Sequence, residues 1–207
     1  MPARSTEVAY LVGDCGAGGG GSGYDLVGGR KMKGTGILFT PENYTKVKDG
    51  VKTQTRRIVK LTDSGRVKLA GSTKNWHLED PDAVQACPYG TIGDRLYVKE
   101  GLERRDLGVR YRRDKVTVGM GEHLWKWQRN TLSPRFMPKW ASRLWLEITD
   151  IQVQRLTTIP QLDAMQEGAD GPDYKVGYKA IWESIHGPGS WESNPYVWAI
   201  SFKKVSP

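Results

Sequence analysis

Cysteine is scarce in this chain, and long hydrophobic runs are lacking. The 207 residues include two cysteines, Cys15 and Cys87, which excludes a disulfide-held scaffold and favours a reducing compartment. No apolar run approaches the roughly 20 residues that a membrane-spanning helix needs. The apolar stretch 8–12 is too short for the core of a signal peptide and is followed by Asp14. We therefore expect a cytoplasmic protein with no membrane partner.

Histidine is also rare, which bears on metal chemistry. His77, His123 and His186 are scattered along the chain, and Cys87 has no partner at the spacing of a metal-binding motif. No local motif assembles a Ser-His-Asp triad. We therefore predict no metal site and no cofactor.

Glycine, in contrast, is concentrated near the N-terminus, where residues 18–23 read Gly-Gly-Gly-Gly-Ser-Gly. Residues 16–21 fit the G-x-G-x-x-G pattern of dinucleotide sites, but no amphipathic helix follows, and no Gly-Lys-Ser/Thr ends the run as in a P-loop. A polyglycine run loses more entropy on ordering than its missing side chains can recover. We predict a flexible glycine-rich tail over residues 1–34 and a folded domain over 35–207.

Positive charge predominates in the chain. Lysine and arginine total 31 against 23 aspartates and glutamates, a formal net charge of +8. Such a balance favours a polyanionic partner through non-specific attraction. The composition, with 38% hydrophobic and 26% charged residues, is that of a folded protein and excludes a disordered or fibrous one.

Local patterns predict strands and helices that interleave without a regular βαβ rhythm. Thr40-Pro41-Glu42 is typical of a helix start, and Asp49-Gly50 of a helix end. Alternating or short apolar runs predict strands at 37–39, 52–59, 93–99, 109–118, 143–153 and 196–205, and further helices are expected at 159–166 and around 178–185. We expect an α+β fold, a barrel-like sheet with flanking helices, with polar insertions near 60–88 and 100–135.

The most suggestive functional motif is Gly50-Val51-Lys52-Thr53-Gln54-Thr55-Arg56-Arg57. On a strand, Lys52 and Arg56 would share one face and Thr55 the other. A lysine near a threonine hydroxyl can act as a general base if burial or neighbouring cations lower its pKa. The alternative is a basic edge strand whose threonines simply favour β conformation.

This motif resembles the ASCH domain family when later segments are taken with it. These segments are 93–98 (Gly-Asp-Arg-Leu-Tyr-Val) and the closing strand 196–202, while 136–143 and 182–185 resemble the longer phage and prophage members. The resemblance covers about residues 34–205. It implies a PUA-like β-barrel with flanking helices, in a superfamily that includes RNA-binding and modified-base-reading modules.

The resemblance also implies catalytic roles. Small ASCH proteins of one branch hydrolyse N4-acetylcytidine with a lysine, a threonine and a glutamate. By resemblance, Lys52 is the proton acceptor, Thr55 the nucleophile, and Glu167 the donor that protonates the leaving amine. This chain differs from that branch in its length, its two insertions and the presence of Arg57. Because Lys52 and Thr55 are three residues apart, they converge only at a bulge, a twist or the end of a strand.

A second reading rests on the basic residues. Arg56, Arg57, Arg110, Arg112 and Arg113 are candidate phosphate contacts, and tryptophans near 125–127 are candidate stacking partners for bases. The alternative is that these arginines simply form a charged, solvated surface with no ligand. The expected partner is RNA, DNA or a modified nucleoside. Besides the amidohydrolase, two other functions stay open: a non-catalytic nucleic-acid-binding module and a phage assembly or host-interaction protein.

Overall fold

The computed structural model describes residues 26–27, 30–68, 73–105, 108–118 and 125–206. Most of the predicted glycine-rich tail lies outside these residues. Its described part forms a small antiparallel pair, β1 (Leu26–Val27) with β2 (Arg30–Lys31). No helix in the described ranges is long and apolar enough to cross a membrane.

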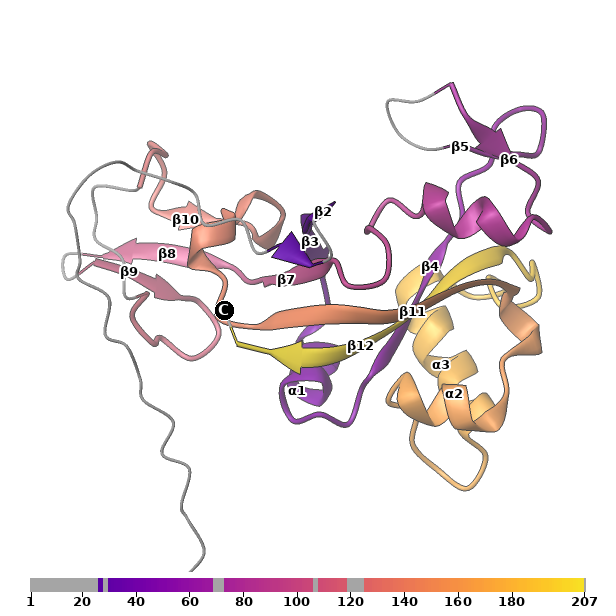
Figure 1. The fold of residues 1–207 in the computed structure, drawn as a ribbon. Helices are drawn as coiled ribbons and strands as arrows, with labels where there is room; N and C mark the ends of the chain where they lie inside the picture. The colour runs from indigo at the N-terminus through magenta and orange to yellow at the C-terminus, as the bar shows by residue number, and fades with distance from the viewer. Residues whose placement is uncertain (1–25, 28–29, 69–72, 106–107, 119–124, 207) are drawn as a thin grey trace, which may run out of the picture.

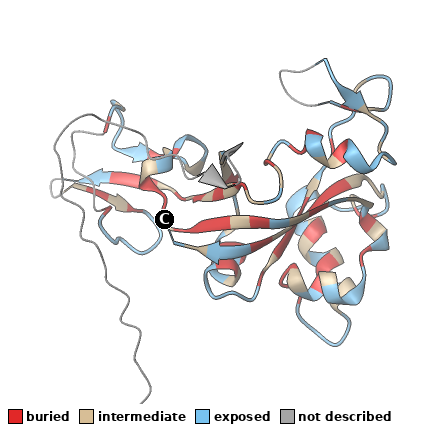
Figure 2. Ribbon diagram, viewed as in Figure 1, coloured by how far each residue is buried: buried red, intermediate tan, exposed pale blue. Residues whose placement is uncertain are grey.

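A five-stranded sheet forms the centre of the molecule (Figure 1). Its order is β3 (Gly34–Leu38), β7 (Arg95–Lys99), β11 (Trp145–Arg155), β12 (Tyr196–Val205) and β4 (Gln54–Ile58). β3 pairs with β7 in parallel, and the other neighbours are antiparallel. Figure 2 shows buried residues along β7, β11 and β12, where alternating apolar side chains supply the main core. The predicted α+β class is confirmed, but the described strands do not pair into a closed barrel.

The two edge strands of this sheet, β3 and β4, approach one another without a backbone ladder between them in the described residues. The guanidinium of Arg57 on β4 donates a hydrogen bond to the backbone carbonyl of Leu38 on β3, at 2.6 Å. The same guanidinium lies 5.4 Å from the centre of the Phe39 ring. We call the boundary between β3 and β4 the seam. The sheet therefore curls toward closure, and a side chain rather than strand pairing joins its edges there.

Within the described ranges, three α-helices flank the sheet: α1 (Pro41–Lys48), α2 (Gln161–Gln166) and α3 (Tyr174–His186). The predicted start and end of α1 are confirmed, because the Thr40 hydroxyl accepts a hydrogen bond from the Asn43 amide and Gly50 takes a φ of +78°. α2 and α3 lie together below β12 in Figure 1 and share a second buried cluster with it, which includes Leu156, Trp182 and Val197.

Strand predictions are confirmed where alternation is long and fail where other contacts intervene. β12 has the predicted bounds, and β11 is shifted by two residues. The strand predicted at 52–59 begins only at Gln54, because the amide of Lys52 donates to Lys46 at the end of α1 and that of Thr53 donates to Gln166 at the end of α2. The strand predicted at 109–118 is wrong in length: β9 (Gly108–Tyr111) ends in a turn.

The residues predicted as insertions form small substructures of their own. The first contains β5 (Val67–Lys68), β6 (Asn75–Trp76) and a 3-10 helix η1 (Pro81–Ala86). The second, which we call the arm, is a sheet of order β10-β8-β9, with β8 at Leu102–Arg105 and β10 at Thr131–Leu132. The arm has a separate buried cluster that includes Leu102, Trp125 and Leu132. Further short 3-10 helices are Pro134–Phe136, Lys139–Ala141 and Leu156–Thr158.

Candidate functional site

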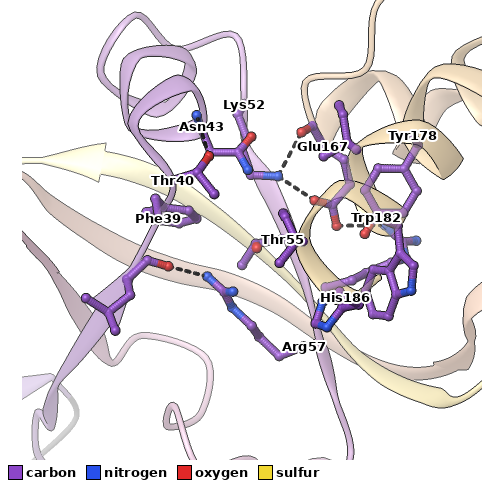
Figure 3. A pocket seen from close by; sticks show the side chains of 14 residues that line it. Phe39, Thr40, Asn43, Lys52, Thr55, Arg57, Glu167, Tyr178, Trp182 and His186 are labelled. Atoms are coloured by element: carbon purple, nitrogen blue, oxygen red, sulfur yellow. Dashed lines mark hydrogen bonds and ion pairs between the residues drawn. The ribbon is translucent and has the colours of Figure 1, made fainter. Parts of the chain in front are cut away.

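A cavity of about 300 Å³ opens where β4 meets the beginning of α1 and the inner side of α3 (Figure 3). The segment that links β3 to α1 supplies Phe39 and Thr40, and α3 supplies Tyr178, Trp182 and His186. Lys52, Thr55, Arg56, Arg57 and Glu167 also line it. The polar groups therefore gather beside an aromatic wall, as in many small-molecule sites.

Lys52 lies just before β4, in the segment held by α1 and α2, and is only 3% exposed. Its ammonium donates to the backbone carbonyl of Glu167 at 2.7 Å and pairs with the Glu167 carboxylate. Because Lys52 is outside the strand, the alternation that would separate it from Thr55 does not apply. The geometric condition that the sequence imposed, a pocket at the end of the strand, is met.

Glu167 is positioned by the end of α2. Its amide donates to the Asp163 carbonyl at 2.8 Å, and the next residue, Gly168, adopts a φ of +81° that turns the chain away. The Glu167 residue is 1% exposed, and its second carboxylate oxygen accepts a hydrogen bond from Arg56 at 3.2 Å. The carboxylate is thus held between two cations, Lys52 and Arg56.

The electrostatic balance at Lys52 favours its neutral form relative to a free lysine. Burial lowers the pKa of Lys52, the positive charges of Arg57 and Arg56 lower it further, and Glu167 opposes them without cancelling the effect of burial. The nearby Tyr178 is affected in the opposite sense: burial and the Glu167 charge raise its pKa well above the ordinary value. Burial therefore makes Lys52 a better proton acceptor in the cavity than an exposed lysine would be.

Thr55 lies on β4, 3% exposed, and lines the cavity next to these groups. Figure 3 places its side chain between Lys52 and Arg57. Among the described residues, no hydrogen bond engages its hydroxyl. The hydroxyl is accordingly available to a molecule in the cavity.

The two arginines after Thr55 take different positions. The Arg56 side chain is fully buried and donates to Asp163 at 2.8 Å, to Gln154 at 3.1 Å and to Glu167. The sequence predicts Arg56 as a phosphate contact, but in the structure it faces α2 and would have to leave these partners to reach a phosphate. Arg57 is half-buried and lies on the cavity wall at the seam.

The arginines predicted in the second insertion lie on the arm and do not line the cavity. Arg110 is paired with Glu103 at 2.8 Å. Arg113 lies over the Tyr44 ring at 4.2 Å and donates to the Pro41 carbonyl. Arg112 is exposed, and no side-chain partner for it is found in the part of the chain that the structure describes. Of these three, Arg112 presents its charge to solvent most freely.

Several cavity residues were not predicted as site residues. Phe39 follows β3, where the sequence predicts the end of a strand, and Asn43 lies in the first turn of α1, where it predicts only a helix start. Trp182 and His186 are one helical turn apart on α3, with ring centres 4.1 Å apart. The spacing of Tyr178 and Trp182 indicated an apolar helix face, but only the fold shows that this face borders a cavity. No group of three or more His, Cys, Asp or Glu side chains is placed to bind a metal among the described residues.

Comparisons with known proteins give distant structural neighbours. No family model matches this chain, and no curated protein matches it significantly. A crystal structure of a DUF984 protein from Enterococcus faecalis V583 matches with a TM-score of 0.42 and 11% identity, covering 85% of this chain and 83% of that one. An ASCH domain from Lactobacillus crispatus JV V101 matches with a TM-score of 0.39 and 11% identity, covering 84% of this chain and 80% of that one. At such similarity, neither match decides what the cavity does.

Proposed function

We propose that the cavity binds a modified cytosine of a nucleoside or nucleic acid and hydrolyses the amide of an N4-acyl group. The observation that carries this proposal is the convergence of Lys52, Thr55 and Glu167 on one cavity, with the pKa of the buried Lys52 lowered. These are the three residues that the ASCH resemblance selects from the sequence. The aromatic wall beside them suits a planar base.

The first half of the reaction transfers the acyl group to Thr55. The neutral amine of Lys52 takes the proton from the Thr55 hydroxyl as its oxygen attacks the acyl carbon. The Lys52–Glu167 hydrogen bond then lets this proton pass to the Glu167 carboxylate and on to the departing amine nitrogen of cytosine. The carbon–nitrogen bond breaks, cytosine leaves with a free amino group, and Thr55 holds the acyl group as an ester.

The second half restores the threonine. Water attacks the ester carbon and gives a proton to Lys52, the bond to the Thr55 oxygen breaks, and that oxygen recovers a proton from Lys52. The carboxylic acid is released, so one water is consumed for each amide cleaved. Arg56, through its contacts with Glu167 and Asp163, acts as a positioning residue for the proton donor.

The test is acetate release from N4-acetylcytidine by the purified full chain. Thr55→Val removes the nucleophilic oxygen while conserving the side-chain shape, and should lower kcat by at least about 10⁴-fold, because the covalent route is then lost. Thr55→Ser keeps an oxygen at this position and is the matched control that retains measurable turnover. Equal activity of wild type and Thr55→Val would overturn the proposal.

A second candidate, binding without chemistry, is favoured by one observation: Lys52 is engaged in an ion pair, the form in which it is not a base. In this second function, the cavity binds the modified base specifically and releases it unchanged. The discriminating result is binding of N4-acetylcytidine by wild type and by Thr55→Val with similar affinity, together with no acetate release by either protein.

A further inference from the structure

A second cavity, of about 500 Å³, lies under the first insertion. Its wall is formed by Trp198 of β12 and Ile58 at the end of β4, and by Val67 and Tyr89 from the insertion region. Thr35 of β3 and Lys60, two residues after the end of β4, also line it. The cavity is thus built at the seam, with the insertion as its cover.

The two cavities follow each other along the seam. The pairings of the sheet make β3 and β4 run in opposite directions. Leu38 lines the first cavity and Thr35 the second, three residues or about 10 Å back along β3. On the other side of the seam, Arg57 lines the first cavity and Ile58 the second. The Arg57–Leu38 hydrogen bond thus joins two residues that line the first cavity, and each of them is within three residues of one that lines the second.

The second cavity combines apolar walls with unpaired polar groups. Trp198 and Val67 close its inner side and are each only 2% exposed, whereas the half-buried Tyr89 is its accessible aromatic side chain. Lys60 and Lys68 are exposed and have no ion-pair partner among the described residues. The Thr35 hydroxyl is buried and also lacks a partner there. Such a set suits a flat apolar group that carries hydrogen-bonding edges and an adjoining anion.

Arg57 supplies a positive charge between the two cavities. One terminal nitrogen of its guanidinium is bound to the Leu38 carbonyl, while its Nε is buried and has no partner among the described residues. A guanidinium binds phosphate with strong charge-assisted hydrogen bonds. Arg57 lines the first cavity, and Lys60 and Lys68 line the second, so each cavity has a cation in its lining.

We propose that the second cavity binds the nucleotide next to the modified one, so that the substrate is a single strand rather than a free nucleoside. The proposal rests on the function assigned to the first cavity. The phosphate that links the two nucleotides lies at Arg57, and the neighbouring base lies against the ring of Tyr89, with its far phosphate at Lys60 and Lys68. The two bases are splayed apart rather than stacked, as is common in sequence-specific binding of single-stranded RNA.

The experiment compares two substrates, N4-acetylcytidine and a cytidine trinucleotide that is acetylated at its middle base. For wild type, kcat/KM should be at least about tenfold higher for the trinucleotide, the gain expected from one stacked base. In the double variant Lys60→Glu/Lys68→Glu, the ratio of the two kcat/KM values should fall toward one. Lys48→Glu, an exposed lysine at the end of α1, is the matched charge-reversal control and should keep the wild-type ratio.

Tyr89→Ala, a second variant, tests the aromatic wall without changing charge and should also reduce the ratio. Equal kcat/KM for the two substrates in wild type, or an unchanged ratio in both cavity variants, overturns the proposal. If neither substrate is hydrolysed, the proposed function fails, and binding of the trinucleotide decides the inference separately. Weaker binding in Lys60→Glu/Lys68→Glu than in Lys48→Glu supports the second cavity, and equal binding in the two rejects it.

Discussion

Two glutamates, Glu167 in the candidate site and Glu103 on the arm, each contact more than one cation, but in different surroundings. The side chains of Lys52 and Arg56 around Glu167 are 3% and 0% exposed. The partners of Glu103, Arg110 and Lys115, are 34% and 56% exposed. Glu103 has a third, more distant cation, Arg105 at 3.6 Å, which is 64% exposed. Both glutamate side chains are themselves buried, so the two clusters differ mainly in how far their cations reach water.

This difference decides what each cluster can do. Exposed cations lose little hydration when they form ion pairs. The ion pairs of the arm cluster therefore contribute little to the free energy of unfolding. Buried charges lose their hydration and depend on each other, which makes the site cluster costly to disturb and lowers the pKa of Lys52. A buried ionic cluster beside a cavity is therefore a better indicator of chemistry than a dense run of arginines.

The largest expected effect comes from removing one charge of the buried cluster. Glu167→Gln leaves the cations Lys52 and Arg56 without their shared anion and should lower the free energy of unfolding by about 3 kcal/mol, the lower end of the range for broken buried pairs, because Arg56 keeps Asp163. Urea denaturation measures the loss. Glu103→Gln is the matched control and should shift the midpoint far less. Similar losses in both variants would remove the distinction between the clusters.

The two clusters should also change the stability of the fold at opposite ends of the pH scale. The pKa of Lys52 in the folded protein lies below its ordinary value of 10.5. Between these two pKa values the unfolded chain binds more protons than the folded one, so the stability of the fold rises as the pH increases through this range. Hydrogen bonding from Lys115, with help from Arg110, holds the pKa of Glu103 below the ordinary 4.5, so its contribution is lost as the pH falls below that value.

Urea denaturation at several pH values, with each variant compared with wild type, measures both the alkaline rise and the acid loss of stability. In Lys52→Met the alkaline rise should disappear while the acid loss stays, and in Glu103→Gln the reverse should hold. An alkaline rise that survives in Lys52→Met would show that another group causes it.

The smallest expected effect concerns the arm and nucleic acid. Arg112 is exposed without a partner in the described chain, whereas Arg110 is already bound to Glu103. Arg112→Ala should reduce the slope of log K against log salt for a single-stranded RNA by about 0.7, the value for one phosphate contact, and Arg110→Ala should reduce it less. A titration at four salt concentrations measures both slopes. Equal slopes in wild type and Arg112→Ala would exclude this arginine as a phosphate contact.

Much of the local structure follows from short-range signals. The bounds of α1 come from Thr40, Pro41 and Gly50, whose backbone preferences act within one or two turns. The bounds of β12 come from alternation that continues for ten residues. The start of β4 could not be predicted in this way, because hydrogen bonds from α1 and α2 hold Lys52 and Thr53 outside the strand.

Local signals in the sequence predict the α+β class, the bounds of α1 and, through the ASCH resemblance, the candidates Lys52, Thr55 and Glu167. They miss the starts of the other two helices, which begin at Gln161 and Tyr174. Only the tertiary structure brought Lys52 to Glu167, 115 residues away in the chain, and turned Arg56 from solvent toward α2. The same holds for the cavity under the first insertion, whose walls come from four separate segments. The physical reason is that propensity acts between near neighbours, whereas burial, and with it the pKa of a lysine, depends on which distant segments pack around it.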